Sequence, residues 1–193
     1  MKKLIFAAIL TSLAVQTQAS TVFFDLVGKG GTGLLPGNQN GTVSGTPGSG
    51  GEVGAGISYD TVANLLTMNV AWGSANGFAN LTGNTTAGHL HGLTASGGTA
   101  AYAQDAGVKY PLNTLAGWNS SASAGGFSGT ISILEADEPG LLNGQLYFNV
   151  HTSLNGAGEI RGNLVVVPEP SMVSLIVIGA ALPLLRLRRK VAA

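Results

Sequence analysis

The segment that decides the fold is residues 146–166, which read LYFNVHTSLNGAGEIRGNLVV. Apolar residues occupy every second position in its first and last parts, a pattern typical of strands buried on one face. Between the two parts lies Asn155-Gly156, the strongest short-range signal for a β-hairpin. We therefore predict that residues 146–150 and 160–166 form antiparallel neighbouring strands.

The same period of two recurs along most of the chain, and no helical period of useful length is found. It predicts five further strands, at residues 21–27, 53–59, 66–72, 86–91 and 127–133. Residues 28–51, rich in Gly, Asn, Ser, Thr and Pro, are predicted to be a long loop, and residues 135–142 a helical turn or loop. The predicted fold class is all-β: an antiparallel, Greek-key-like β-sandwich with Gly-rich loops.

The composition excludes several classes of function. The 193 residues include nine Lys and Arg, nine Asp and Glu, 30 Gly and no Cys. Without Cys there is no disulfide scaffold, thiolate chemistry or Cys-ligated metal site. The zero net charge is an average, because residues 20–167 carry three basic and eight acidic side chains, a net charge of −5. An acidic domain argues against nucleic acid as a partner.

The first 19 residues have the three-part layout of a secretory signal peptide. Lys2 and Lys3 precede a short apolar run, and small residues follow it. We expect cleavage after Ala19, with Ser20 as the alternative site. The run is too short to span a bilayer comfortably, and the competing interpretation is a buried N-terminal helix.

The C-terminal segment, residues 168–193, begins with Pro168, Glu169 and Pro170. A mostly apolar run follows at 172–185, and then a cluster of Arg and Lys. The run predicts a short transmembrane helix whose basic tail stays on the cytoplasmic side. This order resembles the PEP-CTERM sorting signal of Gram-negative bacteria. The resemblance implies a transient inner-membrane anchor that an exosortase removes; the alternative is a permanent tail anchor.

Gly28 to Gly33 match the G-x-G-x-x-G pattern of dinucleotide-binding loops. That function requires a helix directly after the glycines, with its N-terminus on the pyrophosphate. Leu34-Leu35-Pro36-Gly37-Asn38 cannot begin a long amphipathic helix. We therefore reject nucleotide binding.

The chain has three histidines, His89, His91 and His151. Two of them stand two residues apart on a predicted strand, so both point to the same face. If His151 lies beside them, three imidazole nitrogens can bind Zn²⁺ or Cu²⁺, with water or Glu159 in a fourth position. The alternative is that the histidines only form hydrogen bonds to backbone and loops.

Three segments together resemble the CHRD (chordin) domain. They are Gly88-His89-Leu90-His91-Gly92, then residues 142–152 with Tyr147-x-Asn149-x-His151-Thr152, and finally Gly158-Glu159-Ile160-Arg161-Gly162. The resemblance covers roughly Thr21 to Val165.

The resemblance implies an extracellular β-sandwich with no general enzymatic activity. Its motif residues in this chain are His89, His91, His151, Glu159 and Arg161. The last two are expected on one face, paired with each other or with His151. The His-x-His also resembles Cu/Zn superoxide dismutase, but three histidines are too few for two metals.

The leading functional expectation is a secreted, non-catalytic module, with residues 20–167 as the folded domain. Its processing partners would be the secretion machinery and an exosortase. Its destination would be the cell surface or an exopolysaccharide matrix, where it would bind polysaccharide or a surface protein. The alternatives are a single-metal binding protein or enzyme at the three histidines, and a purely structural matrix protein.

Overall fold

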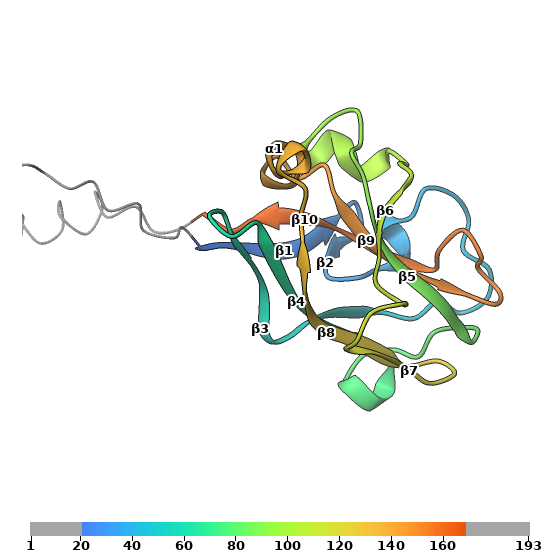
Figure 1. Cartoon of the computed structure of the whole chain (residues 1–193). Coiled ribbons are helices and arrows are strands. Elements are labelled where there is room, and N and C mark those ends of the chain that lie inside the picture. The colour runs from blue at the N-terminus through green and yellow to red at the C-terminus, as the bar shows by residue number, and fades with distance from the viewer. Residues whose placement is uncertain (1–20, 169–193) are drawn as a thin grey trace, which may run out of the picture.

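A computed structural model describes residues 21–168 of the chain (Figure 1). Its strands are β1 (Thr21–Gly28), β2 (Gly31–Thr32), β3 (Gly50–Asp60), β4 (Leu65–Trp72), β5 (Thr85–His91), β6 (Val108–Pro111), β7 (Trp118–Ser120), β8 (Gly125–Ser132), β9 (Tyr147–Thr152) and β10 (Ile160–Val166). Its helical turns are η1 (Pro36–Asn38), η2 (Ser74–Asn76), η3 (Gly98–Ala103), η4 (Glu135–Asp137) and α1 (Glu138–Leu142). The antiparallel all-β prediction is confirmed.

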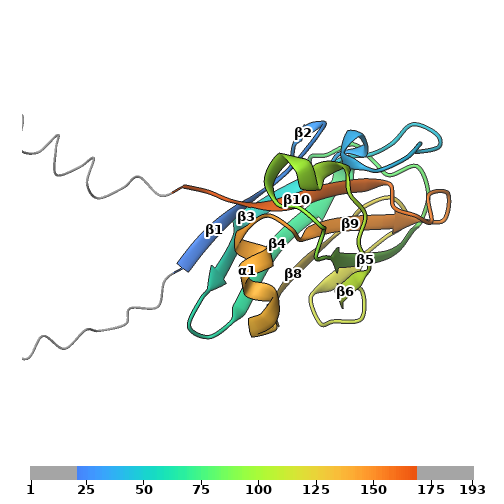
Figure 2. The ribbon, with the colours of Figure 1, turned by 90° about the horizontal axis from the view of Figure 1, so that it is seen from above.

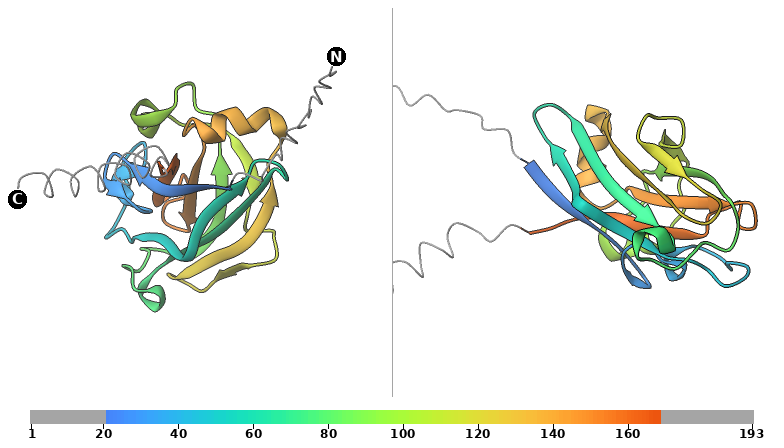
Figure 3. Two further views of the ribbon diagram at one scale, coloured as in Figure 1. Left: turned by 90° about the vertical axis from the view of Figure 1, so that its left-hand side faces the viewer. Right: turned by 90° about the horizontal axis from the view of Figure 1, so that it is seen from below.

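The strands form one continuous sheet in the order β6-β5-β9-β10-β1-β3-β4-β8-β7, with β2 paired to β1. This corrects the expected sandwich of separate sheets. The sheet curls until its ends approach each other, as Figures 2 and 3 show. The Thr85 N–H in β5 donates to the Ala122 carbonyl in the β7–β8 turn at 2.7 Å.

Two features account for the curl. Strands twist with a fixed hand, and a β-bulge adds local bending. The register between β3 and β4 shifts between Glu52 and Ile57, where Gly54 and Gly56 have positive φ angles of 58° and 70°. Glycine adopts this backbone conformation without steric cost. The bulge therefore bends β3 in the middle of the sheet.

The core lies inside the curl and follows the predicted alternation. Leu66, Met68, Val70 and Trp72 in β4 are at most 1% exposed. They face residues from the other half of the sheet, and the Trp72 ring lies 6.4 Å from that of Phe148 in β9. Burying large apolar side chains in this way is the main favourable term for folding.

The predicted hairpin is confirmed, because β9 and β10 pair in antiparallel register. The predicted helical turn at 135–142 is η4 followed by α1. Strands β2, β6 and β7 were not predicted, since they are two to four residues long and lack apolar alternation. After Gly33 there is only the three-residue turn η1, which agrees with the rejection of a dinucleotide site.

Both ends of the described domain lie on the same side of the molecule, at one end of the central strands β1 and β10 (Figure 1). The Val167 N–H donates to the Phe23 carbonyl at 2.8 Å, so the start of β1 and the end of β10 are neighbours. The predicted signal peptide (1–19) and the predicted transmembrane helix (172–185) lie outside the described residues. Within residues 21–168, no helix has the length and apolarity needed to cross a bilayer.

Gly88 in β5 lies where β5 packs against β7, near the opposite end of the strand order. A Cβ at this position would overlap the Trp118 ring in β7 and approach Phe148 to 3.2 Å. We expect Gly88→Ala to lower the free energy of unfolding by about 1–3 kcal/mol through overpacking. Gly107→Ala is the control, because a Cβ there meets nothing within 4 Å. Equal stability of the two variants in urea titrations would contradict this packing.

Candidate metal centre

Two neighbouring strands bring the three histidines together, the condition on which the sequence hypothesis of a metal site depends. In the β5–β9 register, Ala87 lies opposite His151 and His89 lies opposite Asn149. Side chains alternate across a strand, so the histidines share the outer face while Leu90 and Val150 point into the core. One ligand nitrogen from each histidine lies within 4.8 Å of those of the other two.

The hydrogen bonds of the rings determine which nitrogen of two histidines is available. Nδ1 of His91 lies 2.9 Å from the Ala106 carbonyl, and Nδ1 of His151 lies 2.9 Å from the Gly156 carbonyl. A carbonyl only accepts, so both Nδ1 atoms carry the proton and both Nε2 atoms keep a lone pair. Nδ1 of His89 lies 3.1 Å from Nε2 of His151. Within residues 21–168, the buried Nε2 of His91 has no hydrogen-bond partner.

The electrostatics favour neutral rings. Burial, and to a lesser extent the neighbouring His151 and His91, lowers the pKa of His89 to about 4. Burial also lowers the pKa of His91 and of His151, although hydrogen bonds to Ala106 and Gly156 act in the opposite direction. All three imidazoles are therefore neutral near pH 7, the form that binds metal ions.

A stack of side chains fixes the orientation of His91. The Tyr147 ring lies parallel to it, with centroids 4.8 Å apart and an interplanar angle of 8°. The Tyr147 hydroxyl accepts from the Ala106 N–H and donates to the Ala106 carbonyl, both at 3.2 Å. The guanidinium carbon of Arg161 lies 3.5 Å from the Tyr147 centroid. Tyr147 thus holds both the ring of His91 and the carbonyl that sets its tautomer.

Arg161 has no solvent exposure and acts at a distance from the histidines. It pairs with Asp105 at 3.4 Å, donates to the Ala101 carbonyl at 3.0 Å and contacts the side-chain oxygen of Asn163. These contacts hold residues 101–106 against the outer face of the sheet. Arg161 is therefore a positioning residue for the segment that supplies the Ala106 carbonyl.

Glu159 lies elsewhere, which corrects the expectation that it pairs with Arg161 or His151. Strand β10 begins at Ile160, so Glu159 belongs to the preceding turn, where the period of two does not apply. Within residues 21–168 the ion pairs are Lys109–Asp137 and Arg161–Asp105. The structure does not bring Glu159 into the group of three histidines.

The Glu159 carboxylate is fully buried and accepts hydrogen bonds from four residues of three other segments. Its donors are the backbone N–H groups of Gly48 (3.0 Å) and Thr82 (2.7 Å), the hydroxyls of Thr82 (3.2 Å) and Thr152 (2.8 Å), and the amide of Asn155 (3.2 Å). Glu159 therefore joins the loops around Gly48 and Thr82 at the turn of the β9–β10 hairpin.

Sequence reasoning missed the backbone carbonyls of Ala106 and Gly156 and the side chain of Asp105. Nothing in residues 95–126 signals that Asp105 contacts β10. Tyr147 was visible in principle, because it lies two and four residues before Asn149 and His151 on the same face of the strand. Its stacking partner depends on the β5–β9 register, which the sequence does not display.

Glu159→Gln should lower the free energy of unfolding at pH 6 by about 2–3 kcal/mol, because hydrogen bonds to a buried charge are lost. Burial alone would raise the pKa of Glu159, but its hydrogen bonds outweigh this and lower that pKa below 4.5. The stabilisation is thus complete above pH 4.5 and disappears as the pH falls through the folded-state pKa. In urea titrations, the difference in free energy of unfolding between wild type and Glu159→Gln should be smaller at pH 3.5 than at pH 6.

The control is Glu135→Gln at an exposed position, which should change the free energy of unfolding by less than about 0.5 kcal/mol. A Glu159→Gln chain as stable as wild type at pH 6 would refute the hydrogen-bond network of Glu159.

Comparison with known proteins gives one result. Residues 32–164 match the CHRD domain family, and the match contains all three histidines, Glu159 and Arg161. No curated protein and no solved structure matches the chain. Since the match covers more than half of the 193 residues, the chain belongs to the CHRD domain family.

Proposed function

We propose that this CHRD domain is an exported, non-catalytic module that binds one Zn²⁺ or Cu²⁺ ion through His89, His91 and His151. The observation that carries the proposal is the arrangement of ring nitrogens. Nε2 of His151 faces Nδ1 of His89 at 3.1 Å, and the buried Nε2 of His91 has no hydrogen-bond partner among residues 21–168. Both His91 and His151 donate Nδ1–H to a backbone carbonyl. Metal-bound histidines commonly have such a partner on the second nitrogen, which fixes tautomer and orientation.

The distances suit a metal after small ring rotations. Nitrogens that bind one tetrahedral zinc ion lie about 3.3 Å apart, as follows from bond lengths near 2.0–2.1 Å. The candidate ligand atoms lie within 4.8 Å of one another, and one pair is already at 3.1 Å. The three neutral donors also suit Cu²⁺. In either case a fourth position stays open to water.

The open fourth position is also what a single-metal enzyme would need, and this is the second candidate function. Hydrolytic metal sites usually place a general base beside the bound water. The group that the structure forms among residues 21–168 contains three histidines and no carboxylate. Glu159, the acid closest in sequence to the motif, has its hydrogen bonds elsewhere. We therefore favour binding over catalysis.

Metal binding is tested on the full-length chain after treatment with a chelator. Calorimetric titration with Zn²⁺ or Cu²⁺ should show one site, and the ion should raise the melting temperature, because it binds only the folded state. His91→Ala should weaken binding by at least about 100-fold, because losing a residue that only orients a metal-binding histidine already weakens binding by up to about 100-fold. Thr86→Ala, an exposed residue of the same strand, is the control. Metal uptake below about a tenth of an equivalent, or unchanged binding by His91→Ala, would rule out the site.

We further propose that residues 1–19 export the chain and that residues 168–193 act as a PEP-CTERM sorting signal. The support is the order of Pro168-Glu169-Pro170, apolar run and basic cluster. An exosortase would release the domain from a transient inner-membrane anchor to the cell surface or an exopolysaccharide matrix. A polysaccharide or a surface protein would be its partner there.

Replacing Pro168, Glu169 and Pro170 together by Ala should block this processing. We expect the variant to accumulate at full length in the inner-membrane fraction, while the wild-type chain appears shortened in the exopolysaccharide fraction. Ser171→Ala is the control. Immunoblots of fractionated cells distinguish the outcomes. A wild-type chain that stays at full length in the membrane would instead identify a permanent anchor.

A further inference from the structure

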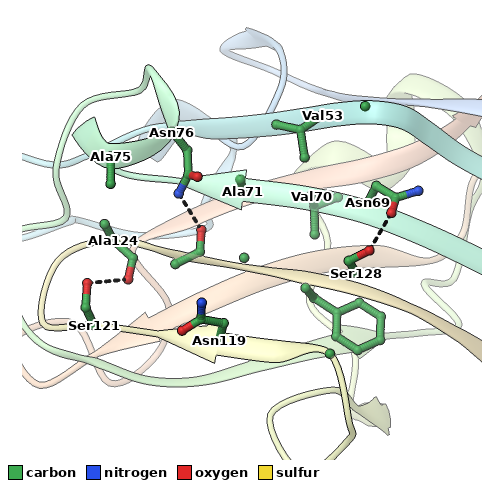
Figure 4. A pocket seen from close by; sticks show the side chains of 15 residues that line it. Val53, Asn69, Val70, Ala71, Ala75, Asn76, Asn119, Ser121, Ala124 and Ser128 are labelled. Carbon is green, nitrogen blue, oxygen red and sulfur yellow. Dashed lines mark hydrogen bonds between the residues drawn. The ribbon is translucent and has the colours of Figure 1, made fainter.

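A groove of about 450 Å³ lies on the outer face of β4, β7 and β8, away from the histidines (Figure 4). Its floor is formed where two small residues, Ala71 and Gly126, are directly paired across β4 and β8. Its sides carry longer side chains, including Asn69, Asn119 and Ser128. The bulged stretch of β3 borders the groove at Val53 and Gly54.

The chemistry of the groove is neutral and rich in hydrogen-bonding groups. None of its lining residues is ionisable, although the domain carries eight acidic side chains. Amides and hydroxyls come from Asn69, Asn76, Asn119, Ser121 and Ser128. Small aliphatic surfaces come from Val53, Ala71, Ala75 and Ala124. A charged ligand would find no counter-charge here, whereas a polyhydroxylated neutral one would find both donors and apolar patches.

Some polar groups of the groove are held by hydrogen bonds within the domain, and others have hydrogen-bonding capacity left for a ligand. The Ser128 hydroxyl donates to the side-chain oxygen of Asn69 at 2.7 Å, and the Asn76 side-chain amide donates to the backbone carbonyls of Trp72 and Gly125, both at 3.0 Å. Among residues 21–168 nothing donates a hydrogen bond to the Asn76 side-chain oxygen, so this atom can accept one from a ligand. The side-chain amide of exposed Asn119 forms no hydrogen bond with any of residues 21–168, and it stands beside the groove in Figure 4.

We propose that this groove binds a neutral polysaccharide chain through its amide and hydroxyl groups. The inference rests on the proposed delivery to a polysaccharide matrix for its setting, and it names the ligand class and the place of contact. A peptide fits less well. Peptides usually add to an exposed sheet edge, whereas the backbone at the floor of this groove is already paired within the sheet.

The test uses the full-length chain in a zwitterionic, sugar-free detergent, immobilised for biolayer interferometry. Dextran and galactomannan are the neutral probes, and alginate is the anionic probe. We expect binding to at least one neutral polysaccharide and none to alginate. Asn119→Ala should weaken it by about 5- to 10-fold, the value of one or two hydrogen bonds. Ala71→Leu should abolish it by filling the floor.

Asn84→Ala, an exposed Asn outside the groove, is the matched control and should bind as wild type. Asn119→Ala removes no hydrogen bond of the folded domain, so it remains informative even if Ala71→Leu fails to fold. No binding to either neutral polysaccharide, preference for alginate, or displacement by a neutral Gly/Ser peptide would overturn the proposal. So would equal binding by Asn119→Ala and Asn84→Ala. His91→Ala should bind polysaccharide normally, so failure of the metal centre and failure of the groove are separate results.

Discussion

A guanidinium group keeps its proton at any ordinary pH, so a buried arginine must find acceptors for its donors inside the protein. Arg161 is such a group, and much of the outer layer is arranged around it. Its partners are Asp105, the Ala101 carbonyl, Asn163 and the ring of Tyr147. Removing these partners would leave an uncompensated charge, a large cost in a protein interior. The segment 101–106 is therefore held in place, and with it the carbonyl that orients His91.

Glu159 has the complementary role two residues earlier. Its carboxylate joins the loops around Gly48 and Thr82 to the hairpin, whose own turn contributes Asn155. The Gly-Glu-Ile-Arg-Gly segment thus contains two buried charges that do not meet each other. Glu159 accepts hydrogen bonds from the loops next to the start of β10, and Arg161 binds the segment 101–106 that covers the outer face of the sheet. Gly158, with a φ of 118°, lies directly before Glu159 and lets the turn lead into the strand.

The long strands, and the shared face of His89 and His91, could be predicted because both depend on a period of two. His89 and His91 share a face wherever the strand pairs, but their proximity to His151 depends on the β5–β9 register, a long-range contact. Glu159 was misplaced because the alternation was extended one residue beyond the strand. The single curled sheet was missed because a bulge near Gly54 has no signature in the apolar pattern. The groove was not predicted because its floor depends on the pairing of Ala71 with Gly126 across β4 and β8, a long-range register that the sequence does not display.

The neighbouring ends of β1 and β10 have a consequence for how such a domain can be combined with others. Because the chain enters and leaves at the same end of the sheet, the domain projects from a polypeptide as a side branch and does not lengthen it. It can be repeated along a chain, or inserted into a surface loop of another protein, without separating the strands of its host. The three histidines and the groove on β4, β7 and β8 would then remain accessible on every copy. Each copy would add its own weak contacts with a shared ligand to those of its neighbours.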